Sequence, residues 1–117
     1  MNKEKWCKSV TLSTGREDLA RFAKYAKIEG RMSVGKFIEN AVITYIEEHG
    51  TDNPVSFAYR PRSPQNPTVS HGLSMRTQEK VRIKECAQKN KRTRSEYTTL
   101  AAHVYIDEKY GVDLEVK

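Results

Sequence analysis

The chain has 117 residues, enough for one modest domain or two very small ones. Its 21 Lys and Arg outnumber its 15 Asp and Glu, and the resulting net charge of +6 favours an anionic partner. Because no apolar run approaches the ~18 residues of a membrane span and the two cysteines are isolated, the composition disfavours membrane, secreted and zinc-finger proteins, and we expect a cytoplasmic one.

The first predicted element is a short strand over residues 8–14. Val10 and Leu12 alternate there with hydroxyl-bearing residues, the pattern of a strand with one buried face. Gly15 ends the strand, and apolar residues at spacings of three and four then predict an amphipathic helix. Gly30 stands where a glycine commonly ends a helix.

A second helix is predicted directly after Ser33, a residue type that caps helix N-termini. Its apolar residues form the most regular stripe in the chain, from Val34 to Ile46. Residues 8–50 therefore make up a strand–helix–helix unit. The next segment, residues 51–69, contains all four prolines and no clear periodicity, so we expect it to be a connector.

The same order of elements returns after the connector. Alternation predicts a strand over residues 72–77, and a weaker apolar stripe predicts a helix over residues 78–90. Thr93, with Glu96 three residues later, has the spacing of a capping box. It predicts a last helix that ends before Gly111.

The two halves correspond at offsets of 60 to 63 residues, which indicates an internal duplication. The predicted organisation is a repeat over residues 8–50, a proline-rich connector over 51–69, a second repeat over 70–111 and a tail over 112–117. A single repeat is too small for a stable core and leaves its strand unpaired, so we expect the two strands to pair antiparallel. The predicted inner face of this ribbon consists of Val10, Leu12, Leu73 and Met75.

Two segments carry a resemblance to a known family. VTLSTGREDLARFAKYAKIEGRMSVGKFIENAV in the first repeat and KRTRSEYTTLAAHVYI in the second resemble the Arc/MetJ type of ribbon-helix-helix protein. The resemblance implies a mostly α-helical fold with a two-stranded antiparallel β-ribbon, in which tandem ribbon-helix-helix repeats form an intramolecular pseudo-dimer. It also implies sequence-specific binding of double-stranded DNA through a ribbon in the major groove.

The resemblance implies roles for individual residues. Outward-facing ribbon residues would contact base edges, and amides at the start of each repeat's second helix would bind phosphate. The implied base-reading residues are Ser9, Thr11, Ser13, Ser74 and Arg76. The implied phosphate-binding residues are Ser33, Val34, Gly35, Thr93, Arg94 and Ser95. The chain departs from the family pattern in two ways, because the first strand lacks a long charged reader and Thr77 stands where an apolar residue is usual.

Basic charge is distributed unevenly between the repeats. Residues 76–94 contain eight Lys and Arg against two Glu, a local charge of +6, whereas residues 16–34 contain five against three acidic residues, a local charge of +2. We therefore expect the second repeat to dominate phosphate affinity. Because Arg76 alone among the implied readers is able to make two hydrogen bonds to guanine, we predict an asymmetric target with a G·C pair on its side.

The remaining reactive residue types receive simpler interpretations. We expect Cys86 to pack as a small hydrophobe, and His103 to lie on the solvent side of the last helix. No Cys/His pair, carboxylate dyad or Gly-rich phosphate loop has a spacing that supports catalysis. We therefore predict that the protein is not an enzyme and has no cofactor or metal site.

The leading functional hypothesis is a transcriptional repressor of plasmid, phage or chromosomal operons, or a conjugation accessory protein that binds DNA near a transfer origin. The alternative is a protein-interaction module, such as an antitoxin or a mobile-element inhibitor, that uses the same fold to bind a partner protein. The apolar residues available for that role are Val55, Phe57, Tyr59, Val112, Leu114 and Val116. The connector is also long enough for two copies of the chain to exchange repeats.

Overall fold

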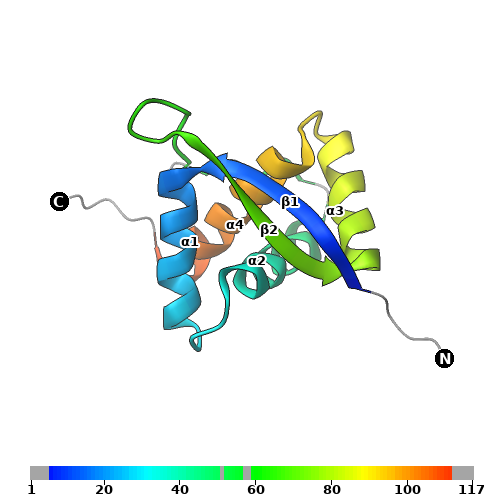
Figure 1. Ribbon diagram of the computed structural model, residues 1–117. Helices are drawn as coiled ribbons and strands as arrows, with labels where there is room; N and C mark the ends of the chain where they lie inside the picture. The colour runs from blue at the N-terminus through cyan, green and yellow to red at the C-terminus, as the bar shows by residue number, and fades with distance from the viewer. Residues whose placement is uncertain (1–5, 51, 57–58, 112–117) are drawn as a thin grey trace.

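The structure is a computed structural model that describes residues 6–50, 52–56 and 59–111, with the backbone alone for residues 6–9 and 74. The described residues contain two strands and four helices, in the order strand, helix, helix, strand, helix, helix (Figure 1). These elements are β1 (Trp6–Gly15), α1 (Arg16–Ile28), α2 (Val34–His49), β2 (Thr68–Arg76), α3 (Thr77–Lys89) and α4 (Arg94–Tyr110). The two strands pair antiparallel, so the predicted mostly helical fold with a two-stranded ribbon is confirmed. None of these helices combines the length and the apolar composition that a bilayer crossing requires.

The ribbon has one buried face and one exposed face, as the alternation predicts. Its buried apolar side chains, each at most 3% exposed, are Val10, Leu12, Leu73 and Met75. Thr11 lies directly opposite Gly72 across the ribbon, and both residues are exposed. Since opposite residues share a face, this is the side that points away from the helices. Figure 1 shows the ribbon crossing in front of the helical layer.

Strand β2 is longer than the sequence predicts at one end and shorter at the other. It begins at Thr68 instead of residue 72, because the additional residues continue the antiparallel pairing as far as Gly15. At its other end the strand stops at Arg76, and Thr77 is the first residue of α3 instead of the last of the strand.

Both predicted N-caps of the long helices are confirmed. Ser33 Oγ accepts a hydrogen bond from the Lys36 amide at 3.2 Å, and Thr93 Oγ1 accepts one from the Glu96 amide at 3.0 Å. The Glu96 carboxylate accepts a hydrogen bond from the Arg92 guanidinium at 2.9 Å. The two caps fix the residues at which α2 and α4 begin.

Each long helix contacts the strand of the other half of the chain. The Ser13 amide of β1 donates a hydrogen bond to Ser95 Oγ of α4 at 3.0 Å. At the corresponding place on α2, Gly35 lies so close to β2 that a Cβ atom would be 3.4 Å from Leu73 Cδ2. The halves are therefore interlocked beneath the ribbon.

Two aromatic contacts join α2 to α4 in the core. The rings of Phe37 and Tyr105 lie 5.9 Å apart at 72°, and those of Tyr45 and Tyr97 lie 6.3 Å apart at 76°. Phe37 and Tyr97 stand 60 residues apart in the sequence, and so do Tyr45 and Tyr105. The second contact therefore repeats the first with the two halves exchanged. Cys86 is buried in the same core at 7% exposure, as predicted.

His103 faces the interior, so the prediction that it lies on the solvent side is wrong. It is 1% exposed, with Nε2 2.9 Å from Asp18 Oδ1 and Nδ1 2.9 Å from the Arg21 guanidinium. Because a guanidinium only donates, Nδ1 accepts and Nε2 carries the proton. Burial lowers the pKa of His103, which favours this neutral form. The connector supplies part of the cover, since the Tyr59 ring lies 6.4 Å from the imidazole.

The end of the connector completes the start of α1. Asn66 is 1% exposed, and its Oδ1 accepts a hydrogen bond from the Glu17 amide at 2.7 Å. Its Nδ2 donates to the Arg60 carbonyl at 3.0 Å, and the Arg16 amide donates to the Pro67 carbonyl at 2.9 Å. Two amides at the start of α1, those of Arg16 and Glu17, are thus satisfied by residues about 50 positions away in the chain.

Gly15 has no room for a side chain at the junction of β1, α1 and the connector. A Cβ atom at Gly15 would overlap the Asn66 amide and the Asp18 carboxylate, whereas one at Gly72 would meet no atom within 4 Å. We expect Gly15→Ala to lower the free energy of unfolding by about 2 kcal/mol, because buried polar groups must move apart. Gly72→Ala is the matched control and is expected to stay within about 0.5 kcal/mol of the wild type. Urea unfolding measures both, and equal losses would contradict the close packing at Gly15.

Candidate nucleic-acid interface

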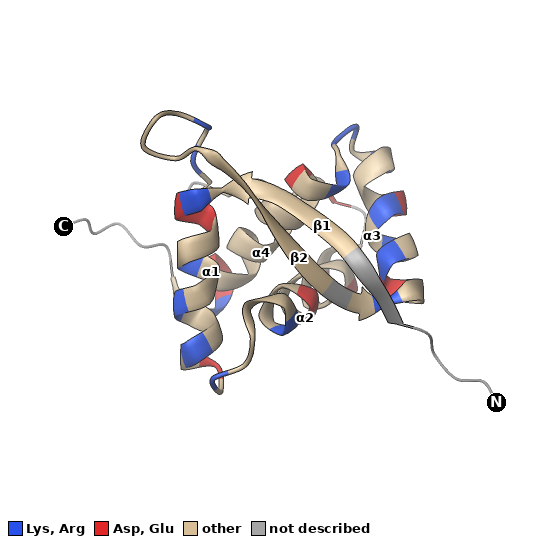
Figure 2. Cartoon of the chain, in the orientation of Figure 1, with Lys and Arg blue, Asp and Glu red and all other residues tan. Residues whose placement is uncertain are grey.

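The exposed face of the ribbon presents small, uncharged residues. Thr11 and Ser13 on β1 are exposed, and so are the residues opposite them on β2, Gly72 and Ser70. Figure 2 shows little charge along the described parts of the strands, with Lys and Arg on the flanking helices α1 and α3 and on the loop before β2. A two-stranded ribbon fits a DNA major groove, which is about 12 Å wide.

The structure brings together some of the predicted base-reading residues. Thr11 and Ser13 share the exposed face, while Arg76 is half-buried at the end of β2, about 13 Å along the strand from Gly72. The Arg76 amide donates a hydrogen bond to the buried Glu39 carboxylate at 3.3 Å, which holds this end of the strand against α2. The side chains of the other two predicted readers, Ser9 and Ser74, lie outside the described part of the chain.

Sequence reasoning missed Ser70 as a candidate reader. Ser70 is exposed and lies directly opposite Ser13, on the outward face of the ribbon. The strand predicted over residues 72–77 does not include it. The signal was present, since Thr68 and Ser70 alternate with Val69 and extend the same period of two toward the N-terminus.

The N-terminus of α2 borders an open groove beside the ribbon. The groove has a volume of about 460 Å³ and is lined by residues 33–36, Glu39 and residues 71–73. The first intrahelical hydrogen bond is donated by the Phe37 amide to the Ser33 carbonyl, so the amides of Val34 and Gly35 precede it. Such amides, at the positive end of a helix dipole, are well placed to bind a phosphate oxygen.

The N-terminus of α4 is more closed. The hollow that Arg94 and Ser95 line against β1 measures about 10 Å³. Ser95 Oγ is already engaged by the Ser13 amide, and both Arg94 and Ser95 are half-buried, whereas the capping residue Thr93 is exposed. The two predicted phosphate-binding sites are therefore unequal, and the more open one belongs to the less basic repeat.

Basic side chains on and after α3 add positive charge beside the ribbon. Arg82 is engaged by Glu79 at 3.1 Å. Lys84, Lys89 and Lys91 are exposed and form no ion pair within the described residues. These three side chains are available for phosphate contacts that do not depend on base sequence.

The residues assigned to the protein-interaction alternative do not form a single described surface. Val55 is 66% exposed, but Tyr59 is half-buried and packs near His103. Phe57 and the tail residues Val112, Leu114 and Val116 lie outside the described residues.

Comparisons with known proteins assign no family to the chain. No protein-family model matches it, and no curated protein or solved structure matches it either. The function of the ribbon and its surroundings therefore has to be inferred from their geometry and charge.

Proposed function

We propose that the chain is a sequence-specific double-stranded DNA-binding protein of the ribbon-helix-helix type, whose two repeats form an intramolecular pseudo-dimer. The observation that carries the proposal is the exposed polar face of the β1–β2 ribbon, with the N-termini of α2 and α4 beside it. A ribbon that binds in the major groove needs outward polar side chains to contact the bases. Phosphate contacts on both sides of the ribbon fix its position along the DNA.

The exchanged aromatic contacts support the pseudo-dimer. The pairs Phe37–Tyr105 and Tyr45–Tyr97 have nearly the same separation and angle, as an approximate twofold axis through the core requires. The contacts of α2 with β2 and of α4 with β1 repeat in the same sense. A homodimer of one-repeat chains would place a true twofold axis there, so the fused chain retains the geometry without strict symmetry.

The proposed mechanism divides the surface between specificity and affinity. Thr11, Ser13 and Ser70 contact base edges in the major groove, and Arg76 contacts guanine at one end of the ribbon. The amides at the start of α2 and α4 bind backbone phosphates on either side. The exposed lysines on and after α3 (Lys84, Lys89 and Lys91) contact phosphates and add affinity without sequence preference.

The cellular role that we propose is repression of transcription or an accessory function in conjugation. Nuclease footprinting on the DNA that surrounds the gene separates these roles. Protection within the promoter of the same gene supports repression, whereas protection next to a nick site supports conjugation.

Binding to random duplex DNA should weaken steeply with salt. If five to nine phosphates are neutralised, the logarithm of the association constant falls against the logarithm of salt concentration with a slope of about −4 to −8. Fluorescence anisotropy with a labelled random duplex measures this slope, and selection of bound sites from the same pool yields the preferred sequence. A flat salt response with no enriched sequence would reject DNA binding and favour the protein-interaction alternative.

A further inference from the structure

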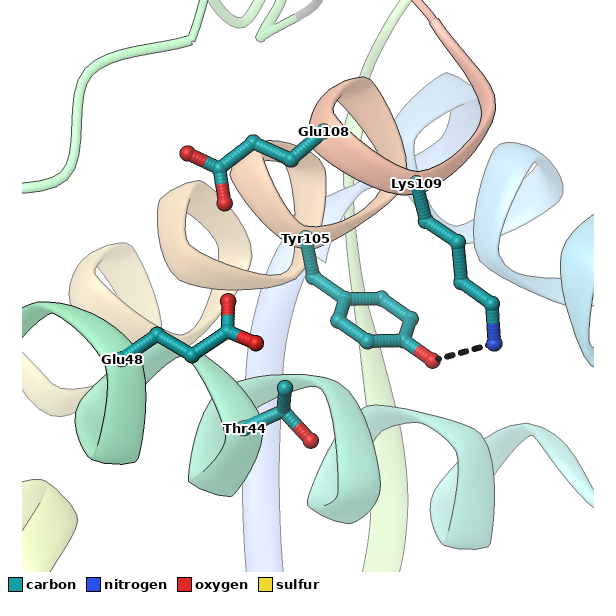
Figure 3. A pocket seen from close by; sticks show the side chains of 5 residues that line it. All are labelled: Thr44, Glu48, Tyr105, Glu108 and Lys109. Atoms are coloured by element: carbon teal, nitrogen blue, oxygen red, sulfur yellow. Dashed lines mark hydrogen bonds between the residues drawn. The ribbon is translucent and has the colours of Figure 1, made fainter.

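A second hollow lies at the opposite ends of the two long helices, away from the ribbon. It has a volume of about 370 Å³ and is lined by Thr44, Glu48, Tyr105, Glu108 and Lys109 (Figure 3). The 16 residues of α2 separate this end from the groove beside β2 by about 24 Å. The hollow is thus distinct from the proposed DNA-binding surface.

One histidine and two carboxylates meet at the edge of this hollow. His49 Nε2 lies 3.0 Å from each Glu108 oxygen. Together with Glu48, these residues offer three ligand atoms that all lie within 4.8 Å of one another. The imidazole is oriented by stacking on the Tyr45 ring, at 4.6 Å between centroids and 27° between planes.

The nearby lysine does not neutralise this cluster. Lys109 Nζ donates hydrogen bonds to the Glu29 carboxylate at 2.7 Å and to Tyr105 Oη at 3.2 Å. Figure 3 shows its side chain directed away from the carboxylates of Glu48 and Glu108, which face each other. The Glu48 side chain has no hydrogen bond or ion pair with any other described residue, so two carboxylates converge where a cation would be favourable.

We propose that Glu48, His49 and Glu108 bind a divalent transition-metal ion such as Zn²⁺. One imidazole nitrogen and two carboxylate oxygens form a ligand set that suits Zn²⁺ better than Mg²⁺ or Ca²⁺, which prefer oxygen alone. Ligand distances of about 2.0–2.2 Å place tetrahedral ligand atoms about 3.4 Å apart. The His49–Glu108 separation is already close to that value, and we expect the exposed Glu48 side chain to reach it by rotation from a position within 4.8 Å.

Metal binding would join the last turn of α2 to the last turn of α4. The ion takes the place of the proton that His49 and Glu108 share, and water completes its coordination. Because the site exists only when the two helices are packed together, the ion stabilises the folded chain, and this stabilisation grows with the logarithm of the free zinc concentration once that exceeds the dissociation constant. The sequence did not reveal this cluster, since 59 residues separate His49 from Glu108.

Calorimetric titration of the tag-free full chain with ZnCl₂ tests the proposal, alongside thermal unfolding with and without zinc. We expect one equivalent of Zn²⁺ to bind and to raise the Tm, and MgCl₂ to do neither. Glu48→Gln, which leaves the His49–Glu108 ion pair in place, and His49→Gln should each weaken zinc binding about tenfold or more. Glu47→Gln removes the adjacent exposed carboxylate and is the matched control, with unchanged zinc affinity.

Two results would overturn the metal site. One is the absence of zinc binding by the wild type under conditions in which circular dichroism shows it folded. The other is zinc binding of unchanged affinity in both single variants, Glu48→Gln and His49→Gln. Zinc held by a cysteine thiol would give this result. Neither result bears on DNA binding, because the ribbon lies at the other ends of α2 and α4.

Discussion

Asp18→Ala is expected to lower the free energy of unfolding by about 3 kcal/mol or more, because it leaves buried donors without their acceptor. The Asp18 side chain is fully buried, and its oxygens lie 2.9 Å from His103 Nε2 and 3.4 Å from the Arg62 guanidinium. Asn66 Nδ2 also donates to this carboxylate at 3.4 Å. One substitution thus affects α1, α4 and the connector together.

Glu17→Ala is the control for this prediction. Glu17 is the preceding residue, and its carboxylate is half exposed at 3.6 Å from Arg60. Exposed ion pairs contribute little, so the loss should remain below about 1 kcal/mol. Guanidinium unfolding of the two variants at neutral pH gives the comparison. If Asp18→Ala were as stable as Glu17→Ala, the buried network would contribute nothing to stability.

A double variant separates two contributions to the free energy of unfolding. One is the penalty for leaving His103 buried without its partner, and the other is the net stabilisation by the Asp18–His103 pair. Replacing both Asp18 and His103 by leucine removes the charge and the closest of its donors together, which is often less harmful than removing one partner. The corresponding position on α2, 60 residues before His103, is the apolar Ile43. We therefore expect the double variant to recover part of the stability that Asp18→Ala loses.

Periodicity and capping were sufficient to predict the type and order of the elements in the repeats, although not both ends of β2. The i, i+3, i+4 stripe after Ser33 places one face of α2 in the core, and a hydroxyl side chain three residues before a donor amide marks where the helix begins. The alternation around Leu12 likewise decides which ribbon face is buried. These are local patterns, and the residues that produce them are neighbours in the chain.

The polar contacts that connect the halves were not predictable in the same way. The pattern of the last helix places His103 on the solvent side. It is buried instead, where it is hydrogen-bonded to Asp18, 85 positions earlier in the chain. Asn66 belongs to a proline-rich segment without periodicity, yet it caps α1 from 49 positions away. The contacts depend on tertiary packing, which a pattern within one segment does not encode.

The two halves differ at the helix N-termini that we propose contact DNA. At corresponding positions, α2 has Gly35 beside an open groove and α4 has Ser95 with its hydroxyl bonded to β1. The basic side chains of the second half lie beside the closed site instead. We therefore expect an asymmetric DNA site. Its asymmetry would come from Arg76, which is present at one end of the ribbon only.

Arg76→Ala is expected to relax the preference for one base pair at one end of the target site. A guanidinium with two hydrogen bonds to guanine discriminates against other bases by about 1–3 kcal/mol, or roughly 5- to 150-fold. The substitution leaves intact the hydrogen bond from the residue 76 amide to Glu39, because that bond does not involve the side chain. The attachment of this end of β2 to α2 is therefore expected to be preserved. Anisotropy with the selected site and with single-base variants measures the change in base preference.

Lys84→Ala provides the contrast that makes the Arg76 assignment specific. Lys84 is exposed on α3, and a phosphate contact there should weaken binding to all duplexes equally and reduce the magnitude of the salt slope by about 1. Arg76→Ala should instead change the ranking of sequences. Had Arg76 only a phosphate contact, its variant would behave as Lys84→Ala does, with uniform loss and an unchanged preferred site. In that event the outward hydroxyls of Thr11, Ser13 and Ser70 would have to account for the sequence preference.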